Sequence, residues 1–194
     1  MRPTHLARTA YHEAGHAVLA YVGGLKVLGT SIEEDGDSYG RTFYAYVAEW
    51  LKADRLADSQ ARRRLEACVL CYLAGVEAEA RFAGRRDWRG ASVDLEDAVS
   101  FAEHVVLSDE ELRAYLRWLG VRVKGLVTVY WALIDGVARR LLERRNMTAR
   151  DVQRTIRTLA HARRNRGALV LGGRALVTRA AARGAGKKRK RARS

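Results

Sequence analysis

Two histidines and a glutamate near the N-terminus have the types and spacing of a zinc-dependent hydrolytic site. Residues 12–16, HEAGH, are an H-E-x-x-H motif within residues 4–22, whose apolar periodicity predicts a helix. Side chains four residues apart share a helix face, so His12 and His16 can bind one Zn²⁺. Glu13 is rotated by about a third of a turn from His12, where it can act as general base on a water molecule at the metal.

The alternative interpretation is a pair of unrelated histidines on an exposed helix. The neighbouring residues are apolar and predict a largely buried helix instead (Ala14, Ala17, Val18 and Leu19). Buried imidazoles beside a buried carboxylate need polar partners, and a metal ion supplies them. The motif therefore predicts one zinc ion per chain, with Glu13 as the catalytic residue.

A catalytic zinc ion has three protein ligands and one open position, so a third ligand must come from elsewhere. The extended H-E-x-x-H-x-x-G-x-x-H form does not apply, because Leu19 and Val22 occupy its glycine and histidine positions. Spacing alone does not choose among five candidates, which are Glu77, Glu79, Asp94, Asp97 and His104. Asp94 has one local argument: Ser92 is a predicted helix N-cap, and the helix dipole favours a carboxylate in the first turn.

The elements around the motif must position these side chains. Gly23-Gly24 ends the first predicted helix, and strand-like segments follow at 26–33 and 40–47. From Asp54 onward the pattern is almost entirely helical. The predicted fold class is therefore mainly α with a small β-sheet (α+β).

Two later helices have predicted starting points. Ser108 and Glu111 have the spacing of a capping box, in which each residue satisfies a backbone N–H of the first turn. Thr148 with Asp151 predicts the start of a helix that runs to about His161.

The positive charge of the chain is concentrated near its C-terminus. The formal net charge is +14, and 14 basic but no acidic residues follow Asp151. We expect a folded domain over residues 1–166 and a basic, largely disordered arm over 167–194. The run KKRKR at 187–191 predicts non-specific contacts with nucleic acid or an anionic surface, unless the arm is simply a solubilising end.

Cysteine content and hydropathy predict a cytoplasmic protein. No apolar run approaches the ~20 residues of a membrane-spanning helix, and the N-terminus has no hydrophobic signal core. The only cysteines, Cys68 and Cys71, exclude a disulfide-built scaffold. They lie in a segment with helical apolar periodicity and have no second pair to complete a zinc site, so we expect them in the core.

Four segments, in order, resemble the peptidase domain of the FtsH-type ATP-dependent zinc metalloproteases. They are TAYHEAGHAVLAY, SYGRTFY, YLAGVEAEARFAG and GASVDLEDA. These are similar to the family's active-site helix, its G-x-T strand, its L-A-G-R-x-A-E-E helix and its G-A-S-N-D-L motif. With NMTARDVQRTI as the counterpart of a late helix, the resemblance covers roughly residues 7–156 and implies an FtsH-peptidase-like helical zincin fold.

The resemblance implies roles for particular residues. Asp94 matches the aspartate of the last motif, which is the family's third zinc ligand. Glu79 remains from the third motif and is expected to orient a ligand histidine, unless it is a solvated helix residue. The strand expected to pair with an extended substrate, or else to be an ordinary half-buried strand, contains Gly40, Arg41, Thr42, Phe43 and Tyr44. The family's peptidase domains form hexameric rings, which makes self-association an expectation here.

The chain also departs from the family pattern. Val93 replaces an asparagine, Val76 an arginine and Ala80 a glutamate. No G-x-x-x-x-G-K-[ST] loop occurs, so the expected enzyme is an ATP-independent zinc endopeptidase that acts on peptides or unfolded polypeptides. One alternative is a peptidase subunit that docks on a separate AAA ATPase. Another is a non-catalytic protein that binds nucleic acid or anions, although such a protein would not need Glu13 beside two intact histidines.

Overall fold

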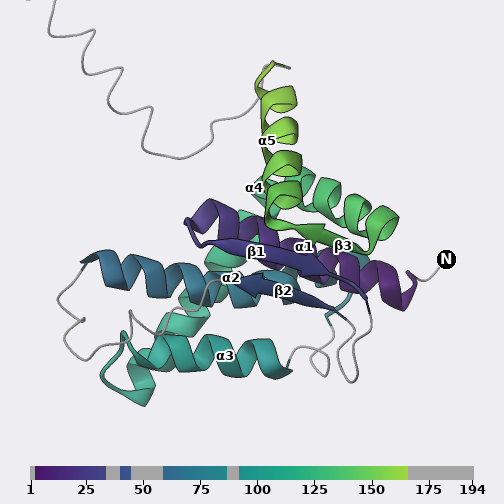
Figure 1. The fold of residues 1–194 in the computed structure, drawn as a ribbon. Helices are drawn as coiled ribbons and strands as arrows, with labels where there is room; N and C mark the ends of the chain where they lie inside the picture. Colours follow the sequence, from purple (N-terminus) through teal and green to yellow (C-terminus); the bar gives the residue numbers. More distant parts are fainter. Residues whose placement is uncertain (1–2, 34–39, 45–58, 87–91, 166–194) are drawn as a thin grey trace, which may run out of the picture. The chain divides into compact units, whose positions relative to one another are not determined.

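The protein is mostly helical with one small antiparallel sheet, which confirms the predicted fold class at this level. A computed structural model describes residues 3–33, 40–44, 59–86 and 92–165 (Figure 1). The described elements are α1 (His5–Gly23), β1 (Val27–Ser31), β2 (Arg41–Tyr44), α2 (Ser59–Ala83), α3 (Ser92–Glu103), α4 (Asp109–Arg144), β3 (Asn146–Thr148) and α5 (Ala149–Asn165).

The chain divides into two units, Met1–Ala160 and His161–Ser194. All the described helices and strands belong to the first unit, apart from the end of α5. The predicted arm over 167–194 lies outside the described residues, as do residues 45–47 of the second predicted strand.

Helix α1 carries the H-E-x-x-H motif, and its ends lie within one residue of those predicted. Thr4 is the N-cap, and its Oγ1 accepts a hydrogen bond from the backbone N–H of Ala7 at 3.2 Å. Gly24 follows the helix with a φ of 78°, a left-handed conformation that glycine adopts without a Cβ clash. Every residue from Ala10 to Ala20 except His12 is buried, so α1 is a central helix of the core.

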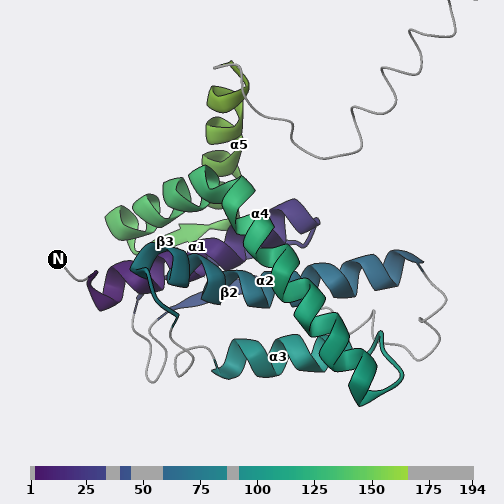
Figure 2. The ribbon, with the colours of Figure 1, turned by 180° about the vertical axis from the view of Figure 1, so that it is seen from behind.

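Helix α1 lies between the sheet and α4, with α2 beside it (Figures 1 and 2). Small residues allow α1 and α2 to approach closely. A Cβ on Gly15 would lie 2.5 Å from the carbonyl oxygen of Ala74 and 2.8 Å from the Cβ of Ala78. Because only glycine permits this approach, the sequence of both helices fixes how near the motif lies to α2.

The sheet has the order β2-β1-β3, and both pairings are antiparallel. Thr30 of β1 is paired with Thr42 on one side and with Met147 on the other. The sequence does not predict β3, because its three residues are too few to show an alternating pattern. β3 follows α4 after a turn at Arg145, whose φ is 65°.

Ser108 caps α4, and Thr148 with Asp151 begins α5, as predicted. The N–H of Glu111 donates to Ser108 Oγ at 3.2 Å, but Glu111 Oε2 accepts from the N–H of Leu107 at 2.9 Å and not from that of Ser108, so the predicted capping box forms on the serine side. At α5 the bonds are reciprocal: the N–H of Asp151 donates to Thr148 Oγ1 at 3.3 Å, and the N–H of Thr148 donates back to Asp151 Oδ2 at 3.2 Å. The serine and threonine hydroxyls thus satisfy N–H groups that the first helical turns leave without partners.

The helical core contains both cysteines, which confirms their predicted burial. Cys68 and Cys71 are buried in α2, and both are free thiols. Helix α4 has 36 residues, is about 54 Å long, and packs against α1, α2 and α3. None of the helices in the described part of the chain is both long and apolar enough to cross a membrane.

Candidate metal centre

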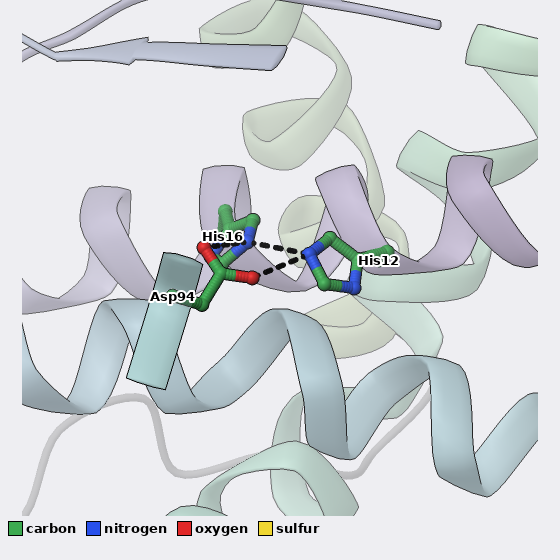
Figure 3. Close-up of side chains that lie close together, drawn as sticks. All are labelled: His12, His16 and Asp94. Carbon is green, nitrogen blue, oxygen red and sulfur yellow. Dashed lines mark hydrogen bonds and ion pairs between the residues drawn. The ribbon is translucent and has the colours of Figure 1, made fainter. Parts of the chain in front are cut away.

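His12, His16 and Asp94 come together from two helices (Figure 3). One ligand atom from each lies within 4.8 Å of the others. His12 Nε2 is 2.8 Å from Asp94 Oδ2 and 3.0 Å from His16 Nε2, and His16 Nε2 is 3.4 Å from Asp94 Oδ1. The motif and the distant aspartate therefore form one cluster.

Asp94 reaches the cluster from the first turn of α3. The described part of α3 begins at Ser92, directly after residues outside the described ranges, so the N-cap role of Ser92 stays a prediction. The carboxylate still has the predicted position near the positive end of the helix dipole.

The outer nitrogens of both imidazoles are held by acceptors. His16 Nδ1 lies 2.9 Å from the backbone carbonyl oxygen of Cys71, and His12 Nδ1 lies 3.2 Å from Glu79 Oε2. A carbonyl or carboxylate oxygen only accepts hydrogen bonds, so each Nδ1 carries the proton. In neutral imidazoles, both Nε2 atoms then present lone pairs toward each other and toward Asp94.

This set of donor atoms fits a zinc ion. Two Nε2 lone pairs only 3.0 Å apart repel each other unless a proton or a metal ion lies between them, and the carboxylate of Asp94 is a further acceptor. Two histidines and one carboxylate are ligands that catalytic zinc uses, with the fourth position left open. Acceptors behind each imidazole fix its tautomer, as is usual for metal-binding histidines.

The charges of the cluster favour a cation. Burial is the largest influence on the pKa of His12 and lowers it, yet the hydrogen bonds to Asp94 and Glu79 raise this pKa above the ordinary value. Burial likewise opposes charge on His16, but the charge of Asp94 and a hydrogen bond to it raise this pKa well above the ordinary value. Burial would raise the pKa of Asp94, but His16 and His12 hold it far below its usual range.

Gly75 of α2 makes room for the two rings, and sequence reasoning missed it. A Cβ at this position would lie 2.3 Å from His16 Nε2 and 2.9 Å from His12 Nε2. A glycine inside a helix destabilises it by about 1 kcal/mol relative to alanine, which was the available signal that this position has a packing role. Gly75 therefore allows the imidazoles to lie directly against α2.

Glu79 and Arg8 form the support behind His12. One carboxylate oxygen of Glu79 contacts His12, and the other accepts hydrogen bonds from Arg8 Nε at 2.8 Å and Nη2 at 2.5 Å. Burial would raise the pKa of Glu79, but its bonds to His12 and Arg8 lower it, so the carboxylate stays charged. Sequence reasoning missed Arg8, although its position four residues before His12 places both on one helix face.

The other candidate ligands are engaged or lie elsewhere. Glu77 forms an ion pair with Arg86, and Asp97 is hydrogen-bonded with Tyr72. His104 is exposed just after the end of α3. Asp97 and His104 follow Asp94 on the same segment but do not join the cluster. Of the five candidates, only Asp94 lies with the two Nε2 atoms, while Glu79 contacts His12 from behind.

Glu13 is buried, 5% exposed, beside the cluster. Its negative charge contributes to the raised pKa values of both histidines, so it lies near them. Thr42 Oγ1 donates to Glu13 Oε2 at 2.7 Å, which places β2 directly against this carboxylate. In this position Glu13 can act as a general base on a water molecule that a metal ion at the cluster would activate.

The predicted substrate strand is an edge of the described sheet. β2 pairs with β1 only, so its other edge has no strand partner among the described residues. Gly40 and Thr42 contact Glu13, while the side chains of Phe43 and Tyr44 lie outside the described part of the structure. The strand is thus adjacent to the predicted general base.

The site is assigned from its own geometry. Two observations carry the assignment, namely the convergence of His12, His16 and Asp94 and the acceptors at both Nδ1 atoms. Neither the protein-family models nor the curated proteins compared with this chain match it.

Proposed function

We propose that the protein is a zinc-dependent, ATP-independent endopeptidase that hydrolyses peptides or unfolded polypeptides. One observation carries the proposal: two Nε2 atoms and a carboxylate converge, while both Nδ1 atoms face acceptors. A buried carboxylate next to this cluster, Glu13, supplies the general base that hydrolysis requires. The resemblance of four segments to the FtsH-type peptidase domain supports the same reaction.

Each residue of the cluster has a distinct part in the proposed reaction. His12, His16 and Asp94 hold the zinc ion and leave one position open for substrate and water. When bound, the ion supplies Lewis acidity that polarises the scissile carbonyl group and makes water a better nucleophile at neutral pH. Glu13 accepts a proton from the attacking water and donates it to the leaving amine.

The position of β2 supports an extended substrate. An edge strand can add a peptide through backbone hydrogen bonds, with alternate side chains turned to either face. Residues 40–44 are next to Glu13, so a peptide added there would pass close to the general base. A folded domain does not expose such a backbone, which favours peptides and unfolded chains as substrates.

The test combines metal analysis with proteolysis. We expect about one zinc ion per purified chain, and digestion of casein that stops with 1,10-phenanthroline and returns on adding Zn²⁺. A protein that contains zinc but cleaves neither casein nor short peptides would overturn the peptidase proposal. Light scattering then tests self-association, including the hexamer that the resemblance implies, and an added AAA ATPase tests the alternative of a docked subunit.

A second candidate function is the binding of a polyanion, and a face of α5 favours it. Arg150, Arg154 and Arg157 are exposed and have the spacing of one helix face, which we call the α5 arginine face. Val152 and Ile156 are buried on the other side of the helix, so this face has no apolar surface to insert into a bilayer. Nucleic acid phosphates are therefore the favoured partner.

Salt-dependent binding to single-stranded DNA tests this candidate. Replacing the three arginines of the α5 arginine face by glutamine should weaken binding and reduce its dependence on salt. The matched control removes the same charge elsewhere on the protein, by replacing three other exposed arginines with glutamine: Arg63, Arg113 and Arg117. Equal losses in both variants would show that net charge alone, and not this face, attracts the DNA.

A further inference from the structure

A chain of two threonines leads from the sheet to Glu13. Thr30 of β1 and Thr42 of β2 are paired across the strands, and their hydroxyl oxygens lie 2.9 Å apart. Thr42 Oγ1 lies 2.7 Å from Glu13 Oε2 and 3.2 Å from the Glu13 carbonyl oxygen. Thr30 is fully buried, so the chain is screened from water at its far end.

The chemistry of the acceptors fixes the direction of this chain. A carboxylate and a carbonyl oxygen only accept, so Thr42 must use its single hydroxyl proton on Glu13. The bond between the two threonines can then form only if Thr30 donates to Thr42. Hydrogen bonds to a charged group are about twice as strong as neutral ones, and a donor chain that ends on a carboxylate is polarised along its length.

Gly40 shapes the space beside the other oxygen of Glu13. A Cβ on Gly40 would lie 3.0 Å from Glu13 Oε1, 3.1 Å from its Cγ and 2.6 Å from Thr9 Cγ2. A larger residue would therefore press on the carboxylate or on Thr9. Thr42 thus bonds Oε2, whereas any side chain at position 40 would occupy the space next to Oε1.

We infer that β2 positions the general base: Thr42, supported by Thr30, holds Glu13 Oε2, and Gly40 keeps Oε1 accessible to the water that it deprotonates. The inference rests on the proposed function, in which Glu13 is the general base. Thr42 and Thr30 are positioning residues, since their side chains act through Glu13.

Physical considerations explain why a glutamate needs this support. Its side chain has several rotatable bonds, and the carboxylate must point at the water with little freedom, because small displacements reduce rates strongly. A buried carboxylate without a donor is also costly. Thr42 meets both needs, so the test must separate positioning from mere stability.

The kinetic experiment compares Thr42→Val, Thr42→Ser and Thr30→Val. Thr42→Val keeps the volume but removes the donor, and we expect kcat on a peptide to fall by about 100-fold with KM and zinc content unchanged. Thr42→Ser restores the hydroxyl and should recover most of the activity. Thr30→Val should have a smaller effect, because Thr42 still donates to Glu13. Thr128→Val removes a threonine bonded to Arg81 on the exposed side of α4 and is the matched control.

A second measurement uses metal-free protein and needs no activity. Thr42→Val should lower the melting temperature of the wild type more than that of Glu13→Leu, because the bond to the carboxylate is already absent in Glu13→Leu and only the bonds of Thr42 to Thr30 and to the backbone carbonyl of residue 13 remain to be lost. Equal shifts in both backgrounds would show that no bond couples the two residues and would overturn the inference.

The outcomes separate this inference from the proposed function. If the wild type cleaves the peptide and Thr42→Val cleaves it as fast, the inference is wrong and the peptidase stands. If the wild type cleaves nothing although the two residues are coupled, the peptidase proposal has failed and Glu13 loses its role as base.

Discussion

Both imidazoles of the cluster are held from behind, and the two supports differ. A backbone carbonyl holds His16, so no substitution at Cys71 removes that acceptor. A carboxylate, itself held by Arg8, supports His12. The orientation of His12 therefore depends on side chains, and that of His16 depends on the backbone.

The substitution Glu13→Gln should separate metal binding from hydrolysis. Glutamine has nearly the same volume and can still accept the hydrogen bond from Thr42, but it cannot take a proton from water at neutral pH. We expect unchanged zinc content and a rate reduced by about 10²- to 10⁴-fold. Zinc analysis and casein digestion on the same preparation check this. Unchanged turnover would identify another base or a contaminating protease.

The substitution Asp94→Ala should weaken zinc binding about as much as His16→Ala. Each removes one of three ligands, and each leaves the remaining acceptors facing one another. Competition with a zinc-binding dye measures both affinities. Asp97→Ala, one turn further along α3, is the control and should keep its zinc. If Asp94→Ala binds zinc as tightly as the wild type, Asp94 is not a ligand.

At the scale of elements, the helix ends were predictable because capping is local. Thr4, Gly24, Ser108 and Thr148 act through bonds to residues at most four positions away. The strand β3 was not predictable, because three residues become a strand only through pairing with β1. The same limit applies to Asp94, whose place beside the histidines depends on how α3 packs. A local argument made Asp94 one candidate, and the resemblance chose it among the five.

Helix α2 should accept no side chain at Gly75. We expect Gly75→Ala to displace the imidazoles and reduce zinc affinity by about 10- to 100-fold, as other changes behind metal ligands do. Gly120→Ala in α4 is the control, because no heavy atom lies within 4 Å of the added Cβ. That control should bind zinc normally and unfold at a higher temperature, since alanine stabilises a helix by about 1 kcal/mol over glycine. Normal zinc affinity in Gly75→Ala would show that the rings can shift without loss.

The capping box of α5 should make the stability of the folded protein depend on pH in the acidic range. Hydrogen bonds from the hydroxyl and then the N–H of Thr148 lower the pKa of Asp151. The folded state therefore binds its proton less readily than the unfolded state, whose pKa is about 3.9. The stabilisation is present above that pH and disappears as the pH falls through the lower, folded pKa. Melting curves of Asp151→Asn should lie below the wild type at pH 7 and approach it at pH 3; a constant gap would contradict this.

At the scale of the whole chain, the residues of the proposed reaction come from widely separated segments. The two histidines and the base lie within five consecutive positions of α1, whereas Thr42 and Asp94 come from β2 and α3. A motif search finds the residues of α1 because they lie close together in the sequence. The positions of Thr42 and Asp94 beside them depend on how β2 and α3 pack, which explains why the sequence left five candidates for the third ligand.

Helix α3 has only two fully buried residues, Ala98 and Ala102, and most of its larger apolar side chains are half-buried, among them Phe101, which stacks on Tyr72 of α2. An ion shared by His16 and Asp94 would act as a cross-link that closes the long loop between α1 and α3. Amide hydrogen exchange should therefore slow in α3 when zinc is added, far more than in α5. A uniform change along the chain would show that α3 is anchored without the ion. The metal would then join two distant parts of the chain as well as activating water, and its removal would loosen the attachment of α3 at its first turn.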